Sequence, residues 1–479
     1  MVDKNRLEKL EKIKGFGINP YPYSFERKNY SQDIKDNFER LKGQTTSVAG
    51  RIMQLRDFGG LVFFHIQDLK GRIQIMVKKE HALEQALKIL NYLDLGDIVG
   101  VEGEITKTQK GEISINAKNI TILAKSIRAI PDKYKGLTDI ELRYRKRYLD
   151  LIANPSVKNY FIIRQKIIDS IREFLNSRGY LEVDTPILQK VYGGAAAKPF
   201  TTYHNALGQK LYLRISNELY LKRLIIGGIE KVYEFSKDFR NEDIDSTHNP
   251  EFTQVEFYEA YKDYNDYMEL TKEMFSKILK DIGLGKKFKY QDKTIDFDDF
   301  KKISLYEEIK KKTSIDITEW KDEEQAYEEV NALGLKPSKK TLGKCIDALI
   351  DEYVIKELVN PTFLIDFPYY ICPLTKQKRD NPKLAERFEL IIAGYECANC
   401  YSELTDPIEQ RKKFLEQAKN LKKGDEESNP VDEDFLEAIE YGMPPTAGMG
   451  LGIDRLCMIL TNNISIKEVI LFPSLRDQN

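Results

Sequence analysis

Two stretches of alternating residues, 230–240 and 251–261, constrain the fold of this chain more than any other feature. Successive side chains of a strand point to opposite faces, so this pattern predicts two β-strands joined by a polar loop. The residues that would share one face are Glu234, Ser236, Asp238 and Arg240 in the first strand and Phe252, Gln254, Glu256 and Tyr258 in the second. Two such faces side by side predict the floor of a binding pocket.

The loop between these strands concentrates groups that bind nucleotides. Arg240 offers paired donors to a phosphate or carboxylate, and Phe252 offers a flat face to a base such as adenine. Glu242 and His248 add an acid and an imidazole to the same turn. An ordinary amphipathic hairpin with a solvated turn is the alternative, and the density of these four side chains favours a site that holds ATP in a bent shape.

A different pattern occupies the N-terminal part of the chain. Five short alternating segments are separated by turn residues, with a helical stretch at 80–93 between the third and the fourth. The predicted strands are 47–56, 61–68, 72–78, 97–106 and 112–123. Five strands with a helix in this place predict an OB-fold β-barrel, a fold that binds oligonucleotides.

The pattern predicts an α+β chain in four parts. We expect a helical extension at 1–46, the barrel at 47–125, a linker at 126–152 and a large domain at 153–479. Strands and helices of the large domain alternate without a regular βαβ rhythm, which favours an antiparallel sheet with flanking helices. A helical insertion is predicted at about 270–355, with a short strand pair near 287–297. Further helices are predicted at 4–14, 31–42, 139–152 and 156–177.

Charge is distributed unevenly along the 479 residues, although the formal net charge is only −1. Residues 1–150 contain 28 Lys and Arg against 20 Asp and Glu, which leaves 47 against 56 in the remainder. A basic N-terminal part suits a polyanion such as nucleic acid, and a well-solvated surface is the alternative. The five cysteines have no disulfide-framework spacing, and no secretory signal or membrane-length apolar segment is visible, so we expect a cytoplasmic protein.

Acidic residues of the large domain predict a metal ion and a cationic ligand. Glu389 and Glu396 are spaced to share a phosphate site, where paired carboxylates usually hold Mg²⁺, and ion-paired surface acids are the alternative. Glu218, Glu256 and Glu403 would make another part of the pocket acidic, which suits a cationic substrate.

A glycine-rich run at 442–455 opens onto a predicted helix at 453–460. Glycines allow a backbone to approach a flat ligand, and a helix N-terminus attracts anions, so Arg455 would meet a phosphate. The spacing differs from the dinucleotide-binding fingerprint, which argues against a Rossmann fold. Cys397 and Cys400 have the spacing of a zinc or redox pair, but no second pair exists, and we favour two cysteines in a strand.

Three of these segments together resemble motifs 1, 2 and 3 of the class II aminoacyl-tRNA synthetases. They are the helix that ends in 178–186, the Arg240 loop and the Arg455 segment. Over nearly its full length the chain resembles the class II lysyl-tRNA synthetases, most specifically at 193–200, 239–253, 401–404 and 444–448. The resemblance implies an enzyme that activates lysine with ATP to lysyl-adenylate, releases pyrophosphate and transfers lysine to the 3′ end of its tRNA.

The resemblance also implies roles for individual residues. ATP would be bound by Arg240, Glu242, His248, Phe252, Glu389 and Arg455, of which Arg240 and Arg455 would be catalytic. Lysine would be bound by Gly194, Glu218, Glu256, Tyr258, Asn399, Tyr401 and Glu403. Among these, Gly194 and Glu218 would receive the α-ammonium group, and Tyr258 and Glu403 the ε-ammonium group. Mg²⁺, about three ions per subunit at most, would be bound with ATP at Glu389 and Glu396.

The barrel resembles the anticodon-binding domain of the same family. Phe63 would stack on an anticodon base, with Arg56 and Gln74 as readers of base edges. Phe64 points to the opposite face, so we expect one of the two aromatic rings in the barrel core. The implied partners are tRNA(Lys), ATP, L-lysine and a second copy of the chain, since motif 1 forms the subunit interface of the family, and no membrane is implied.

Some positions depart from the family pattern, and other functions remain as alternatives. Ser216-Asn217 stands where Ala-Pro is usual, Asp243 replaces a glycine, and residues 397, 398 and 400 are Cys, Ala and Cys instead of Ile and Gly. The nearest alternative is an aspartyl- or asparaginyl-tRNA synthetase, but an aspartate pocket needs a cation where this chain has Glu403. A lysylating enzyme for a protein target would lack the barrel. A catalytically inactive RNA-binding relative would lack the phosphate and metal ligands.

Overall fold

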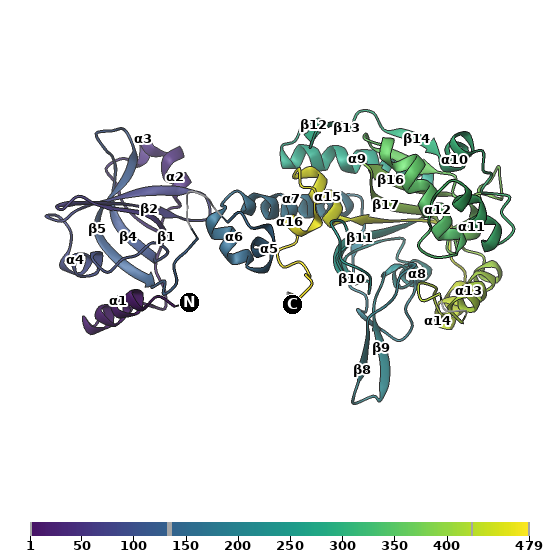
Figure 1. Cartoon of the computed structure of the whole chain (residues 1–479), viewed down its shortest axis with the longest axis horizontal. Coiled ribbons are helices and arrows are strands. Elements are labelled where there is room, and N and C mark those ends of the chain that lie inside the picture. Colours follow the sequence, from purple (N-terminus) through teal and green to yellow (C-terminus); the bar gives the residue numbers. More distant parts are fainter. Residues whose placement is uncertain (1, 132–136, 423–424, 478–479) are drawn as a thin grey trace. The chain divides into compact units, whose positions relative to one another are not determined.

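The computed structural model describes residues 2–131, 137–422 and 425–477. The chain divides into two units, Met1–Pro155 and Ser156–Asn479 (Figure 1). Part of the linker predicted at 126–152, including Gly136, lies outside the described residues. None of the described helices has both the length and the apolar character needed to cross a bilayer.

The first unit is built around a closed five-stranded barrel in the order β1-β2-β3-β5-β4, which confirms the predicted barrel. Its strands are β1 (Thr45–Asp57), β2 (Leu61–Gln67), β3 (Arg72–Lys78), β4 (Ile98–Lys107) and β5 (Ile113–Ala124). In β3 every second residue, Ile73, Ile75 and Val77, is buried, while Gln74 remains half-exposed. Helix α4 (Glu84–Leu90) follows β3 in the predicted place but is shorter than 80–93.

Three helices precede the barrel, namely α1 (Lys4–Gly15), α2 (Ser31–Asp36) and α3 (Phe38–Leu41). Ile13, Ile34 and Phe38 belong to the same hydrophobic core as the barrel strands, so these helices pack on the barrel. The prediction of one helix at 31–42 is wrong. Asn37 leaves helical geometry at φ −114° and ψ 24°, and its side chain donates to the Asp33 carbonyl at 2.9 Å.

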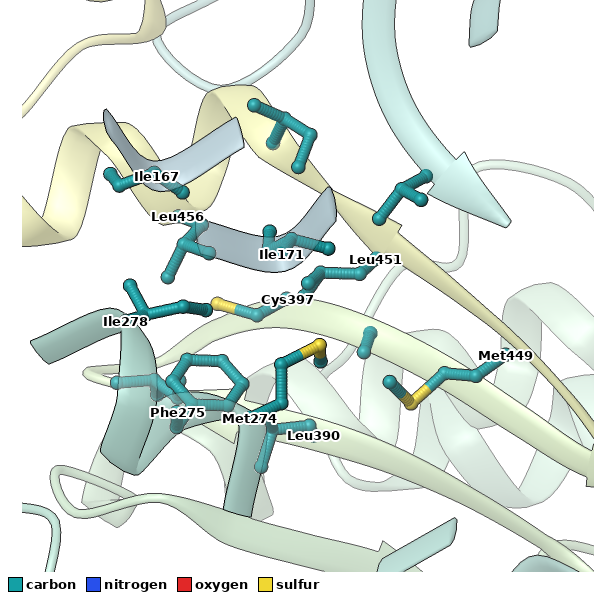
Figure 2. Packing of buried hydrophobic residues seen from close by; sticks show 14 of the residues in the cluster. Ile167, Ile171, Met274, Phe275, Ile278, Leu390, Cys397, Met449, Leu451 and Leu456 are labelled. Carbon is teal, nitrogen blue, oxygen red and sulfur yellow. The ribbon is translucent and has the colours of Figure 1, made fainter. Parts of the chain in front are cut away.

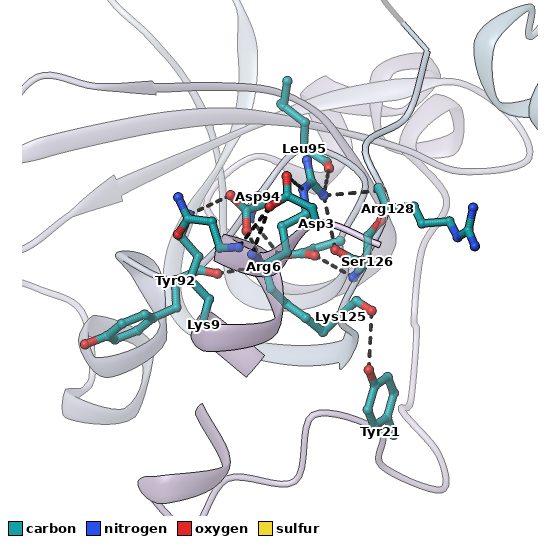
Figure 3. A network of polar contacts seen from close by, with 12 residues as sticks. Asp3, Arg6, Lys9, Tyr21, Tyr92, Asp94, Leu95, Lys125, Ser126 and Arg128 are labelled. Atoms are coloured by element: carbon teal, nitrogen blue, oxygen red, sulfur yellow. Dashed lines mark hydrogen bonds and ion pairs between the residues drawn. The ribbon is translucent and has the colours of Figure 1, made fainter. Parts of the chain in front are cut away.

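A buried ion cluster joins helix α1 to the end of β5 (Figure 3). The Nζ of Lys125 lies 2.6 Å from an Asp94 oxygen and 2.8 Å from an Asp97 oxygen. Lys9 of α1 also contacts Asp94, at 2.6 Å. Because an unpaired charge is costly in a protein interior, this cluster fixes which residues of the helix face the barrel.

Two short helices, α5 (Ile140–Arg145) and α6 (Arg147–Ala153), stand where one basic helix was predicted at 139–152. Lys146 breaks the helix with φ −123° and ψ 57°. The buried carboxylate of Asp150 contacts Arg143 at 2.9 Å and Arg147 at 2.8 Å, so one acid holds both helices together.

The second unit contains an eight-stranded sheet, whose strand order is β14-β15-β16-β17-β18-β11-β10-β6. Its strands are β6 (Leu181–Glu182), β10 (Lys231–Phe239), β11 (Glu251–Ala260), β14 (Lys301–Ser304), β15 (Thr362–Ile365), β16 (Arg387–Ile392), β17 (Tyr395–Ser402) and β18 (Thr446–Gly452). Neighbouring strands are antiparallel except at the two edges, where β6 pairs with β10 and β14 with β15 in parallel. The predicted α+β architecture with an antiparallel sheet is therefore confirmed.

One face of this sheet is packed by helices α7 (Val157–Asn176), α9 (Tyr264–Ile282) and α15 (Ile453–Leu460). Ile171, Phe275 and Leu456 come from these three helices and meet in one buried cluster (Figure 2). In β11, Val255 joins this cluster, whereas the next residue, Glu256, lines a cavity on the other face. The period-two pattern thus separates the core from the polar side of the sheet.

The segment predicted as an insertion at 270–355 is partly integrated into the main fold. Helix α9 begins before it and fills the core, and β14 within it extends the main sheet. The predicted strand pair is β12 (Lys287–Tyr290) with β13 (Lys293–Asp296). The remaining elements are β7 (Leu188–Gln189), β8 (Thr201–His204), β9 (Gln209–Leu213), α8 (Glu218–Ile226), α10 (Leu305–Thr313), α11 (Glu323–Ala332), α12 (Leu342–Leu349), α13 (Pro407–Lys422), α14 (Glu433–Glu440), α16 (Ile466–Val469) and the helical turns Ile350–Val354, Ile355–Glu357 and Tyr369–Ile371.

Candidate active site

A cavity of about 490 Å³ lies on the polar face of the large sheet. Strands β11, β16, β17 and β18 supply much of its wall, together with the loop after β10 and the start of α8. The predicted site residues that line it are Gly194, Glu218, Arg240, Glu242, His248, Phe252, Glu256, Tyr258, Glu389, Glu396, Asn399, Tyr401 and Arg455. Segments far apart in the sequence therefore meet around one space.

Cationic groups converge on one part of this cavity. The Arg240 guanidinium lies over the Phe252 ring, 5.0 Å from its centroid. Arg455 places one guanidinium nitrogen 3.1 Å from Nε2 of His248, and another donates to the Glu396 carbonyl at 2.8 Å. Because guanidinium groups bind phosphate oxygens in pairs, this arrangement can hold a polyphosphate chain.

Glu389 and Glu396 face the same cavity from β16 and β17. Burial and the neighbouring Glu396 charge raise the pKa of Glu389 to about 8, although Arg387 opposes that rise. Arg387 lies 2.5 Å from Glu389 and donates to Asn399 at 3.2 Å. Arg387 was not among the predicted site residues, although the alternation of residues 387 and 389 in one strand could have revealed it.

A second part of the cavity is acidic. Glu256 accepts hydrogen bonds from Ser216 at 3.0 Å, from Gln254 at 2.6 Å and from the Tyr258 hydroxyl at 3.3 Å. Burial, with the charges of Asp238 and Glu218, raises the pKa of Glu256 well above its usual value. Ser216, which departs from the family pattern, thus helps to fix the orientation of an acid in the pocket.

Gly194 packs closely against the acidic part. Its φ of +91° favours glycine, and a Cβ there would lie 2.8 Å from the Ser216 hydroxyl and 3.1 Å from Cβ of Glu218. Gly194 and Glu218 were predicted to act on the same ammonium group, and they lie next to each other.

Glu403 is the predicted lysine ligand that is not on the cavity wall. Its carboxylate is fully buried and forms an ion pair with Lys222 of α8. Its carboxylate lies beside the lining residue Gly448, because a Cβ built on that glycine would be 2.5 Å from Glu403 Oε1. Lys222 was not among the predicted site residues, although its position four residues after Glu218 places both on one helix face.

The predicted anticodon residues lie on three neighbouring strands of the barrel, β1, β2 and β3. Arg56 of β1 is directly opposite Phe63 of β2, and Gln74 follows on β3. Phe64 is the ring in the barrel core, whereas Phe63 is partly exposed and packs edge-on against Phe58 at 6.3 Å. The amide of Gln74 donates to Glu112 at 2.7 Å, which holds it at the barrel surface.

The other departures from the family pattern include Cys397, Cys400 and Asp243. Cys397 and Cys400 lie in β17 as predicted, and all five cysteines are buried and free. Asp243 forms an exposed ion pair with Arg476 at 2.9 Å. Among the described residues, no group of three or more His, Cys, Asp and Glu side chains is arranged to hold a metal ion.

Comparisons with known proteins agree with this geometry. Residues 139–476 match the family of class II tRNA synthetases (D, K and N), and residues 46–123 match the OB-fold nucleic acid binding domain. A lysine–tRNA ligase of Carboxydothermus hydrogenoformans is 48% identical, over 99% of this chain and 98% of its own. Lysine–tRNA ligases of Thermoanaerobacter pseudethanolicus and Clostridium perfringens are 49% and 47% identical, each over 99% of this chain and 96% of their own.

Proposed function

The chain belongs to the class II lysyl-tRNA synthetases, and from this membership we propose that it is a lysine–tRNA ligase. The carboxylate of lysine attacks the α-phosphorus of ATP, and the bond between this phosphorus and the oxygen that bridges to the β-phosphate breaks. Pyrophosphate departs, and lysyl-adenylate is formed. A hydroxyl of the terminal tRNA adenosine, by family preference the 3′, then attacks the lysyl carbonyl carbon and loses its proton, and AMP leaves.

The observation that carries this proposal is the division of one cavity into a cationic and an acidic part. Arg240, His248 and Arg455 suit the triphosphate, while Glu218 and Glu256 suit a substrate that carries two ammonium groups. Phe252 and Glu242 would contact the adenine. No protein nucleophile is required, because positioning and neutralisation of developing charge supply the catalysis.

The remaining wall residues complete the proposed lysine site. Asn399 and Tyr401 would position the amino acid, Gly194 would accept from its α-ammonium group, and Tyr258 would contact the ε-ammonium group together with Glu403. Since Glu403 Oε1 lies beside the lining residue Gly448, the role proposed for it requires the ammonium group to reach the part of the cavity next to this glycine.

We further propose Mg²⁺ as the metal that accompanies ATP. Two carboxylates, Glu389 and Glu396, face the same cavity, so this pair offers oxygen ligands to a cation. Two carboxylates fit an ion that also takes oxygens from the phosphates. When bound, Mg²⁺ would neutralise charge on the leaving pyrophosphate.

The barrel would bind the anticodon of tRNA(Lys). Phe63→Ala should lower the kcat/KM of tRNA charging by about ten- to a hundredfold, since stacking on one base is worth about 1–3 kcal/mol. Lysine-dependent ATP–pyrophosphate exchange should stay unchanged, because Phe63 is partly exposed and belongs to the other unit. Phe16→Ala, which removes an exposed ring elsewhere on the same unit, is the matched control. A parallel loss of exchange would assign Phe63 a structural role instead.

A homodimer and a cytoplasmic location are also proposed. The motif 1 segment exposes apolar side chains, with Ile162 on α7 44% exposed and Leu181 on β6 52% exposed, as a subunit interface would require. Five free, buried cysteines suit a reducing compartment. The molar mass in solution tests the dimer.

Amino-acid-dependent ATP–pyrophosphate exchange tests the proposed function. Exchange with lysine supports it, and exchange with aspartate or asparagine would identify the alternative synthetases. Absence of exchange with any amino acid would instead support the alternative of a catalytically inactive RNA-binding relative.

A further inference from the structure

Lys222 is a buried cation at the acidic part of the cavity. Its side chain is fully buried on α8, and its Nζ lies 2.5 Å from Glu218 and also contacts Glu403. These two carboxylates are the ones proposed to receive the α- and ε-ammonium groups of lysine. The protein therefore places an ammonium group of its own between both recognition acids.

Charge balance explains why a cation belongs in this place. Glu218, Glu256 and Glu403 together provide three carboxylates, and the amino acid provides two ammonium groups, while its own carboxylate would pair with Arg240. Without a further cation, one buried carboxylate would remain unpaired or would take up a proton. Lys222 supplies the missing positive charge from outside the cavity wall.

We propose that Lys222 is a positioning residue that holds Glu218 and Glu403 in place and favours the ionised form of Glu403, and so sets the charge of the pocket to match an amino acid with two ammonium groups. This inference rests on the proposed function and deepens it. Lys222 is fully buried and is not among the residues that line the cavity, so it would act on the substrate through Glu218 and Glu403.

The groups around Lys222 support this role. Burial alone would lower the pKa of Lys222, but the two carboxylates outweigh it and raise that pKa above its usual value, so Lys222 stays charged. Burial raises the pKa of Glu403 to about 8 even though Lys222 opposes the rise. The titratable and charged side chains that face this cluster are Glu218, Glu256, Tyr258, Lys376, Tyr401 and Glu403.

Lys222→Met tests the proposal through the pH profile of exchange. Loss of the cation should raise the pKa of Glu403 further, so the acid limb of kcat/KM for lysine should move up by about one to three pH units. At neutral pH the KM for lysine should rise at least about tenfold, a cost near 1.4 kcal/mol. The KM for ATP and the unfolding temperature serve as structural controls, and raising the pH should restore much of the lysine binding.

Lys222→Met combined with Glu403→Gln keeps the test decisive if the single variant is unstable. The double variant removes one cation and one carboxylate, so the net charge of the cluster of Lys222, Glu218 and Glu403 stays as in the wild type and the protein should fold. Its acid limb should return to the wild-type position. An unshifted limb in Lys222→Met, or equal losses for lysine and ATP at every pH, would overturn the proposal. Wild-type exchange is measured first, so that absence of lysine-dependent exchange would count against the proposed function and not against Lys222.

Discussion

Arg240→Gln should lower lysine-dependent ATP–pyrophosphate exchange by about 10²–10³-fold, the usual effect of removing one group that stabilises transition-state charge. Arg240 lines the cavity with its guanidinium over the Phe252 ring, and we propose that it pairs there with the lysine carboxylate and the α-phosphate. The glutamine keeps a donor and similar length but loses the charge. Because both substrates would pair with Arg240, kcat should fall. A change in the KM for lysine or in the KM for ATP alone should not account for the loss of exchange.

The measurement is the exchange rate at varied lysine and varied ATP. Arg411→Gln, on an exposed part of α13, is the control and should leave both rates within about twofold, as surface ion pairs contribute little. A variant of Arg240 with near-normal kcat would show that the charge acts only in binding, or not at all.

Glu403→Gln should raise the KM for lysine by about a hundredfold while the KM for ATP changes little. Removing one partner of a buried, hydrogen-bonded charge pair costs about 2–5 kcal/mol. Glu403 is fully buried and paired with Lys222, so its neutral substitute also leaves Lys222 with Glu218 alone. The expected rise in KM therefore has two causes. The ε-ammonium group of lysine loses its proposed partner, and Lys222 loses one of its two carboxylates.

Lysine and ATP dependence of exchange separate these effects from general damage. Glu437→Gln, on the exposed face of α14, is the matched control. Equal losses for lysine and ATP would remove the proposed recognition role of Glu403. The unfolding temperature of each variant shows whether the buried pair has been lost from the fold.

Local pattern was enough to predict the strands that form the cavity floor. Alternation in 230–240 and 251–261 predicted β10 and β11, and it separated Val255 in the core from Glu256 on the cavity side. The same period of two predicted the barrel, because inward residues such as Ile73 and Ile75 must be apolar in so small an interior. The hydrophobic periodicity did not predict the interruption of the helix at the single residue Asn37.

The helical composition of 270–355 did not reveal which parts of this segment join the main fold. Composition reports local structure but not which element a helix packs against. Phe275 on α9 belongs to the main core, and β14 pairs with β15 across a long stretch of intervening chain. Long-range pairing of this kind depends on the whole sheet, and a window of sequence does not contain it.

The sequence by itself determined the alternating strands, the barrel and the identity of the polar residues around the cavity, because side-chain direction in a strand follows from backbone geometry alone. Only the tertiary structure decided that Glu403 lies beside Gly448 and pairs with Lys222. The charge on a buried acid depends on which cation reaches it through space, and that partner is chosen by the packing of α8 against the sheet.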